Sequence, residues 1–304
     1  MTNKKQTILR LIIYLFISFG IPFILVFIYV ANFGWTINTN WYSPLAAFSM
    51  FCPMIANILT RIITKEGFNN SYIKMKIKGN IRYFVIALIF PFMCGISIAV
   101  FTALLIFPEN VLGNMIEHFR FTDFLVLTAY LAAVTIASIF QGFGEEFGWR
   151  AYMLPKLETL MPFPAAIIFG GIIWGMWHAP IIACGHNFGT DYPGHPWVGI
   201  GLMCISCICI GLYLTALTKS CKSVLPAALA HIAINNISGS LSGTMLSYID
   251  IPESTMAELG IDFSYSLLFV VITSLFALAT GIIILLLSQK AKSINSDIIP
   301  DQTQ

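Results

Sequence analysis

Charged side chains are scarce in this sequence, and that scarcity excludes several classes of protein. Asp, Glu, Lys and Arg together make up 10% of the 304 residues, and the formal net charge is +2. Such a small and dispersed charge does not form the basic face that nucleic-acid binding requires, and there is no glycine-rich phosphate-binding loop. The sequence also lacks an HExxH motif and so carries no specific zinc signature. We therefore expect no nucleic-acid partner.

The sequence also lacks the paired cysteines of a disulfide framework. Its seven cysteines are an odd number, and most lie inside apolar runs, where a free thiol behaves as a small hydrophobic side chain. We therefore expect free thiols. The cluster CISCIC, Cys204 to Cys209, is interpreted in the same way rather than as a metal-binding tract. The cysteines in apolar runs are Cys52, Cys94, Cys184, Cys204, Cys207 and Cys209.

Apolar residues are abundant. The chain is 58% hydrophobic, contains 25 phenylalanines and has a mean hydropathy of +0.83, which is typical of an integral membrane protein. We predict an all-α polytopic fold with about eight transmembrane helices, each near the ~20 residues that cross a ~30 Å hydrocarbon core. The predicted spans are Ile8–Val30, Ser43–Ile63, Tyr83–Phe107, Phe124–Leu154, Ala165–Cys184, Trp197–Thr218, Val224–Leu246 and Tyr265–Leu287.

The charges of the connecting segments predict the orientation. Lys4 and Lys5 precede the first apolar run and Arg10 lies in its first turn. The run is too long for the hydrophobic region of a signal peptide and is interpreted as an uncleaved helix. With eight spans and a cytoplasmic N-terminus, the cytoplasmic segments hold every lysine, and Arg120 is the one arginine in a segment on the opposite face. We expect a multi-pass protein of the cell membrane with both termini in the cytoplasm. Residues 1–304 are interpreted as one membrane domain, with a frayed tail over 290–304.

The segment 142–150, GFGEEFGWR, supplies the first candidate functional residues. Ionisable side chains within a membrane helix cost roughly 2.5 to 3.5 kcal/mol each, so they usually face the protein interior and serve a function. Glu146 and Arg150 stand four residues apart, the spacing of a helical ion pair. Glu145 is rotated by about 100° from Glu146, so one carboxylate can pair while the other faces a cavity. Alternatively, both glutamates only pair with the arginine at a helix end.

Two further spans carry polar residues at depth. His178 follows Trp174 by one helical turn, and His231 precedes Asn235 by one turn. Either group could be a packing or interhelical hydrogen-bonding feature, but polar faces on three helices favour one shared site. A straight helix that starts at Phe124 carries Glu145 about 32 Å along its axis. We therefore expect the site in the cytoplasmic half of the membrane.

These residue types suit hydrolysis. A glutamate in an apolar setting can take a proton from water, with His178 sharing the water or protonating the leaving amine. His231 and Asn235 can hydrogen-bond the developing oxyanion. No cofactor is favoured on this reading. The alternative chemistry uses a zinc ion held by Glu145, His178 and His231 to activate the water.

The three motifs resemble those of the CPBP family, the CAAX proteases and bacteriocin-processing enzymes also called Abi. The matching residues are EExxxR at Glu145–Arg150, an aromatic residue four before His178, and HxxxN at His231–Asn235, within a core of about 124–245. Trp174 stands where phenylalanine is commoner in the family. The resemblance implies an intramembrane endopeptidase of a family long regarded as metalloproteases, with its catalytic cavity inside a helical bundle.

The resemblance also implies roles for individual residues. It makes Glu145, His178, His231 and Asn235 catalytic, with Glu146 and Arg150 in pairing or orienting roles. Its implied substrate is a membrane-associated protein or peptide, either of CAAX type or as in peptide and bacteriocin processing, met in the lipid bilayer. A non-catalytic alternative is an immunity factor, a scaffold or a small transporter.

Overall fold

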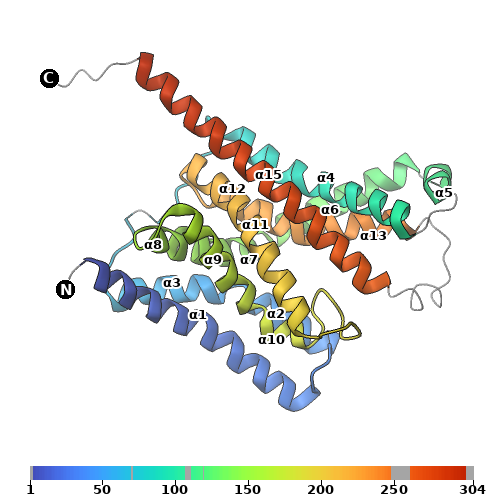
Figure 1. Ribbon diagram of the computed structural model, residues 1–304, viewed down its shortest axis with the longest axis horizontal. Coiled ribbons are helices and arrows are strands. Elements are labelled where there is room, and N and C mark those ends of the chain that lie inside the picture. The colour runs from blue at the N-terminus through green and yellow to red at the C-terminus, as the bar shows by residue number, and fades with distance from the viewer. Residues whose placement is uncertain (1–2, 70, 107–110, 119, 248–260, 299–304) are drawn as a thin grey trace.

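The computed structural model describes residues 3–69, 71–106, 111–118, 120–247 and 261–298, and within these ranges the chain is built from helices without a strand. Figure 1 shows long helices packed in a bundle, with both chain ends on one side of it. The predicted all-α polytopic fold is confirmed. The elements are α1 (Asn3–Phe33), α2 (Thr39–Ser49), α3 (Cys52–Ile63), α4 (Ile81–Ile106), α5 (Val111–His118), α6 (Phe121–Ala137), α7 (Ile139–Gly148), η1 (Trp149–Met153), α8 (Leu154–Glu158), α9 (Phe163–Trp177), α10 (Ala179–Ala183), α11 (Trp197–Cys221), α12 (Leu225–Ala233), η2 (Ile234–Ser238), α13 (Gly239–Ser247) and α15 (Ile261–Ile298).

The number of spans differs from the prediction of eight. Five of the described helices are long and apolar enough to cross a membrane, and α6 with α7 and α8 forms a sixth that bends by 50°. The predicted span from Ala165 is shorter, because α9 has 15 residues and is about 22 Å long. The predicted span from Val224 is divided into α12, η2 and α13. Helix α15 continues to Ile298, beyond the start of the predicted frayed tail; 299–304 lie outside the described residues.

The bundle has two distinct ends (Figure 1). We call the end that holds the start of α1, the α3–α4 connection and the last turns of α15 the termini end. The end that holds the α1–α2 and α10–α11 connections is the distal end. Helix α1 therefore leaves the termini end and α15 returns to it.

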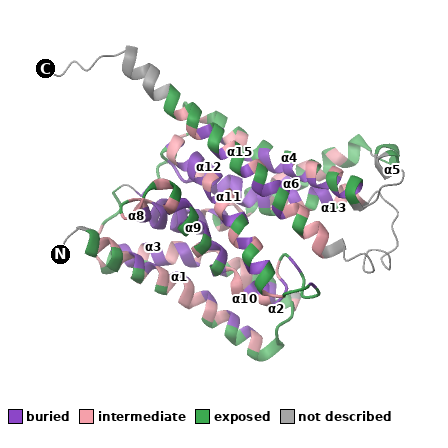
Figure 2. Cartoon of the chain, viewed as in Figure 1, coloured by how far each residue is buried: buried purple, intermediate pink, exposed green. Residues whose placement is uncertain are grey.

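Burial separates a core from a lipid-facing surface. Figure 2 shows buried residues concentrated on α9, α11 and α12, while α1 and α15 carry exposed outer faces. Large apolar side chains dominate those faces, including Phe16 at 79% and Leu287 at 62% exposure. In a membrane these side chains meet lipid tails, so their exposure carries no cost. All seven cysteines are free, as predicted.

Glycines let the helix that carries the two glutamates approach its neighbours. An added Cβ at Gly142 would lie 2.4 Å from the Ala228 carbonyl oxygen of α12, and one at Gly148 would lie 2.3 Å from the Pro53 Cβ of α3. Close approach of backbones through small residues is a main source of helix association in membranes. The glycines of the GFGEEFG segment therefore fix where α7 lies between α3 and α12.

Replacement of Gly148 by alanine is expected to destabilise the protein by about 1 to 3 kcal/mol, the usual cost of overpacking a tight contact. The matched control is Gly20→Ala, because an added Cβ at Gly20 has nothing within 4 Å and alanine is the better helix former. Thermal unfolding of detergent-solubilised protein measures both variants. Equal stability of the two would contradict this explanation of the motif glycines.

Candidate active site

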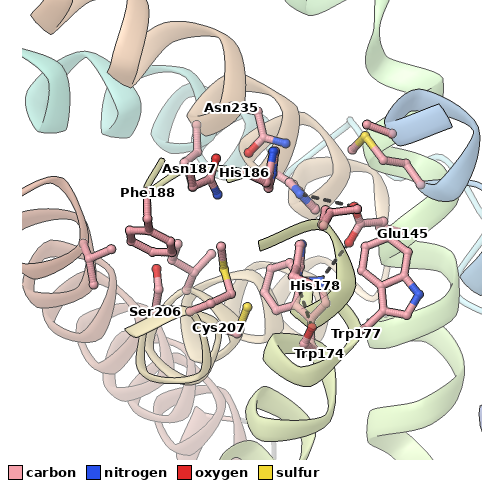
Figure 3. A pocket seen from close by; sticks show the side chains of 18 of the residues that line it. Glu145, Trp174, Trp177, His178, His186, Asn187, Phe188, Ser206, Cys207 and Asn235 are labelled. Carbon is pink, nitrogen blue, oxygen red and sulfur yellow. Dashed lines mark hydrogen bonds and ion pairs between the residues drawn. The ribbon is translucent and has the colours of Figure 1, made fainter. Parts of the chain in front are cut away.

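One cavity of about 390 Å³ gathers the four residues expected to form the site: Glu145, His178, His231 and Asn235 all line it. Figure 3 shows the side chains of Glu145, His178 and Asn235 around this space, together with Trp174, Trp177 and Cys207. The volume lies within the range of small-molecule and peptide-binding clefts. Three separate stretches of sequence thus meet at one polar site inside an apolar bundle.

Glu145 is held by two indole rings. Its side chain is buried, at 2% exposure, and its Oε2 accepts hydrogen bonds from Trp149 Nε1 at 3.1 Å and from Trp174 Nε1 at 2.8 Å. The two donors fix the carboxylate plane and leave Oε1 for the cavity. Phenylalanine at position 174 could not donate this hydrogen bond, so Trp174 does more than keep an aromatic wall.

Glu146 is the centre of a second, fully buried cluster. Its Oε1 lies 3.1 Å from Arg150 Nη1 and 2.7 Å from His231 Nδ1. The Arg150 guanidinium also stacks over the Trp174 ring, 4.0 Å from its centroid. The expected pair of Glu146 and Arg150 is therefore present, and His231 joins it. Both partners contact Oε1, while the buried Oε2 has no hydrogen-bond partner among the described residues, so the pairing offsets only part of the cost of burying this carboxylate.

His178 lies at the break between α9 and α10. Its Nδ1 is 2.9 Å from the Trp174 carbonyl oxygen, which can only accept, so Nδ1 carries a proton and Nε2 remains available to the cavity. Pro180 stands at the start of α10 and cannot continue the α9 hydrogen-bond pattern. The break places the imidazole at the cavity wall.

His231 and Asn235 approach the cavity from α12 and η2. His231 Nε2 lies 3.9 Å from Glu145 Oε1, a separation that suits one bridging water. Asn235 is exposed to the cavity and belongs to a π-helical turn. A second π-helical turn, η1, directly follows the two glutamates. Such turns often occur at functional sites because they redirect side chains within a helix.

Sequence reasoning missed several residues of this site. His186 and Asn187 line the cavity from the α10–α11 connection, and burial lowers the pKa of His186 to about 4. Their segment has the sequence GHNFGTDYPGHP. From its composition alone, this segment is predicted only to be a polar loop. Asn57 of α3 was also missed; its Nδ2 donates to the Phe147 carbonyl at 2.7 Å and so supports the backbone beside Glu146. No motif spacing marks an asparagine in that position.

The three residues of the zinc alternative, Glu145, His178 and His231, line the same cavity. Among the described residues, no group of three or more His, Cys, Asp or Glu side chains is placed to hold a metal ion. Glu145 Oε2 already accepts two indole hydrogen bonds, and Nδ1 of His231 binds Glu146. These side chains are arranged to bind one another, and we derive no step through a metal.

The walls of the cavity include Ala46 of α2 and His186 and Asn187 of the distal connection, so the cavity extends from Glu145 toward the distal end. The expectation that the site lies in the cytoplasmic half of the membrane stays a prediction.

Comparison with known proteins agrees with the site. The fold and cavity define a polytopic helical membrane protein with a buried carboxylate and histidine site. Residues 127–237, which contain all three motifs, match the family described as type II CAAX prenyl endopeptidase Rce1-like. The chain is also 27% identical over 174 residues to CAAX prenyl protease 2 of Methanococcus maripaludis, a match that covers 56% of this chain and 60% of that protein. Over these parts of its length the chain is similar to CAAX prenyl proteases.

Proposed function

We propose that this protein is an intramembrane endopeptidase that hydrolyses a peptide bond of a membrane-associated protein or peptide. The observation that carries this proposal is the meeting of Glu145, His178, His231 and Asn235 on one cavity of about 390 Å³. The matched relative is named a protease, and the matched segment contains every residue that the mechanism uses. The chain matches less than two thirds of that relative's length.

Water activation is assigned to Glu145 with His178. Glu145 Oε1 faces the cavity while the two indoles hold Oε2, so the carboxylate is oriented to take a proton from water. The Nε2 atom of His178 is its free acceptor, because Nδ1 is engaged with the Trp174 carbonyl. His178 can thus share the water and later carry a proton to the leaving amine.

Oxyanion stabilisation is assigned to His231 and Asn235. The buried cluster holds two carboxylates and one guanidinium, and a protonated His231 would balance the remaining negative charge, as buried charges require. Its Nδ1–H then donates to Glu146 at 2.7 Å, and its Nε2–H points toward the cavity. Asn235 offers a second, uncharged donor. Glu146 and Arg150 position His231 and take no part in proton transfer.

Reconstituted protein provides the direct test of the activity. Proteoliposomes that contain the wild-type chain are expected to generate new peptide termini from a mixture of membrane-associated peptides. His178→Ala should remove these products, because the water loses an acceptor. Mass spectrometry of the termini reports the result, and identical products from both proteins would contradict the proposal.

Asn235→Ala should lower turnover by about 10² to 10³, the usual effect of removing one oxyanion donor. The matched control is Asn236→Ala, because the neighbouring Asn236 donates instead to Ser138 Oγ at 2.9 Å. Turnover of Asn236→Ala, normalised to folded protein, should stay near that of wild type. If both variants lose turnover equally, Asn235 has no special role.

Activity is expected to survive exhaustive chelation, because no step uses a metal. Turnover with and without chelator and the metal content of purified protein together check this expectation. Stoichiometric zinc that is lost in His178→Ala together with activity would instead support the zinc mechanism.

We further propose that both termini face the cytoplasm of a cell-membrane protein. The described lysines gather at the termini end, and cytoplasmic segments are enriched in lysine and arginine. Exposed acidic residues of the distal end, including Glu117, Asp123 and Asp191, support the same orientation.

A further inference from the structure

We propose that the cavity opens toward the distal, extracytoplasmic end of the bundle, so that its substrate is a polypeptide segment presented at the outer face of the membrane. This inference rests on the proposed protease function for its substrate and on the proposed orientation for its side. The direction of opening within the bundle stands on geometry alone.

Exposed cavity residues point to the distal end. Asn187 belongs to the distal connection and is exposed, while Ala46 on the opposite wall is half-buried and follows the other distal connection by a few residues. The Asn187 carbonyl accepts a hydrogen bond from Ser266 Oγ at 2.9 Å, which ties this connection to the distal part of α15. Figure 3 shows His186 and Asn187 beside Asn235 at the cavity, so the polar lining includes residues of the distal connection.

Aromatic side chains fill the path toward the termini end. Trp149 follows Glu145 by one helical turn and donates to it, and its ring packs edge-on against Tyr14 with centroids 5.8 Å apart. The Tyr14 ring also packs on Tyr152 at 5.1 Å. All three side chains are at most 1% exposed. A polypeptide could reach Glu145 from the termini end only if this layer came apart.

Beyond Trp174 the space is too small for a substrate. A cavity of about 20 Å³ lies there, lined by Arg150, Cys207 and Gly211 among others, and this volume suits about one water. The space on the distal side of Glu145, about 390 Å³, is of a size that accepts a peptide segment. Of these two spaces, only the one on the distal side of Glu145 is large enough for a substrate.

The charges of the connecting segments indicate which end of the bundle faces the outside of the cell. Exposed lysines such as Lys74 and Lys78 lie in the α3–α4 connection at the termini end, whereas the connection that lines the cavity carries exposed Asp191. The excess of basic residues on cytoplasmic segments therefore makes the distal end extracytoplasmic. A substrate that enters there has crossed the membrane or is embedded with its scissile segment near the outer face.

Thiol labelling of intact cells tests the opening without any need for catalysis. Three single-cysteine additions are compared with the unsubstituted chain as a blank: Asp191→Cys for the distal surface, Ala46→Cys for the cavity wall, and Lys78→Cys for the termini end. The probe is a membrane-impermeant sulfonated maleimide, added before or after permeabilisation. Asp191→Cys and Ala46→Cys should be labelled in intact cells. Lys78→Cys should be labelled only after permeabilisation.

Two results would overturn the inference. One is labelling of Ala46→Cys only after permeabilisation, which would place the opening on the cytoplasmic side. The other is labelling of Lys78→Cys in intact cells, which would invert the orientation. Adding Glu145→Gln to Ala46→Cys should leave the labelling unchanged, because access does not require the catalytic carboxylate. If labelling is as expected but the reconstituted protein yields no cleavage products, the proposed direction of opening stands and the proposed protease function is refuted.

Discussion

Replacing Glu145 by glutamine is expected to reduce peptide cleavage by about 10² to 10⁴, the contribution of a positioned general base, while folded protein remains abundant. Glutamine keeps the volume and can still accept from Trp149 and Trp174 through its amide oxygen, so the indole contacts at 3.1 and 2.8 Å survive. It cannot take a proton from water. Turnover of the reconstituted protein and its melting temperature measure the two quantities separately.

The matched control for this change is Glu158→Gln. Glu158 forms an ion pair with Lys219 whose side chains are partly exposed, and such pairs contribute about 0 to 1 kcal/mol. The control should therefore keep both stability and turnover. Retained cleavage in Glu145→Gln would remove this carboxylate from the mechanism.

Arg150→Ala is expected to have the largest effect on stability, a loss of about 3 to 5 kcal/mol. Arg150 is 5% exposed and Glu146 is fully buried, so the variant leaves a buried carboxylate without its guanidinium partner. It also removes the guanidinium that stacks on Trp174 at 4.0 Å. The yield of monodisperse protein and its thermal unfolding report the loss.

Glu146, the ion-pair partner of Arg150, supplies the control. Adding Glu146→Gln to Arg150→Ala should recover part of the stability, because the unpaired charge is gone and the two sites are coupled. Lys219→Ala, which breaks the partly exposed pair with Glu158, should cost far less. A stable Arg150→Ala protein without activity would show that Arg150 touches substrate and is more than a positioning residue.

Local patterns were sufficient to predict the helices and the candidate residues. Apolar runs mark where a chain must form helices in a membrane, and ionisable residues inside such runs mark a site because their burial needs a reason. The spacing of four residues between Glu146 and Arg150 predicted the ion pair that the structure contains. The meeting of His178 and His231 on one cavity also followed from polar faces on separate helices.

Features that depend on helix breaks could not be predicted in this way. The bend after Ala137 and the π-helical turns at Trp149–Met153 and Ile234–Ser238 divide helices that were predicted as continuous spans. His186 reaches the cavity from a loop, for which no periodicity exists. The second bond of Glu146, to His231, joins residues 85 apart and has no local signal.

Comparison of protein termini in membranes from cells that carry wild type or Glu145→Gln tests the central claim most directly. If the chain is an endopeptidase, wild-type membranes should contain new termini of one or a few membrane-associated polypeptides, and the uncleaved forms should accumulate in the variant. Glu158→Gln membranes should match wild type. Identical termini in wild-type and Glu145→Gln membranes, with both proteins folded and equally abundant, would contradict the protease assignment.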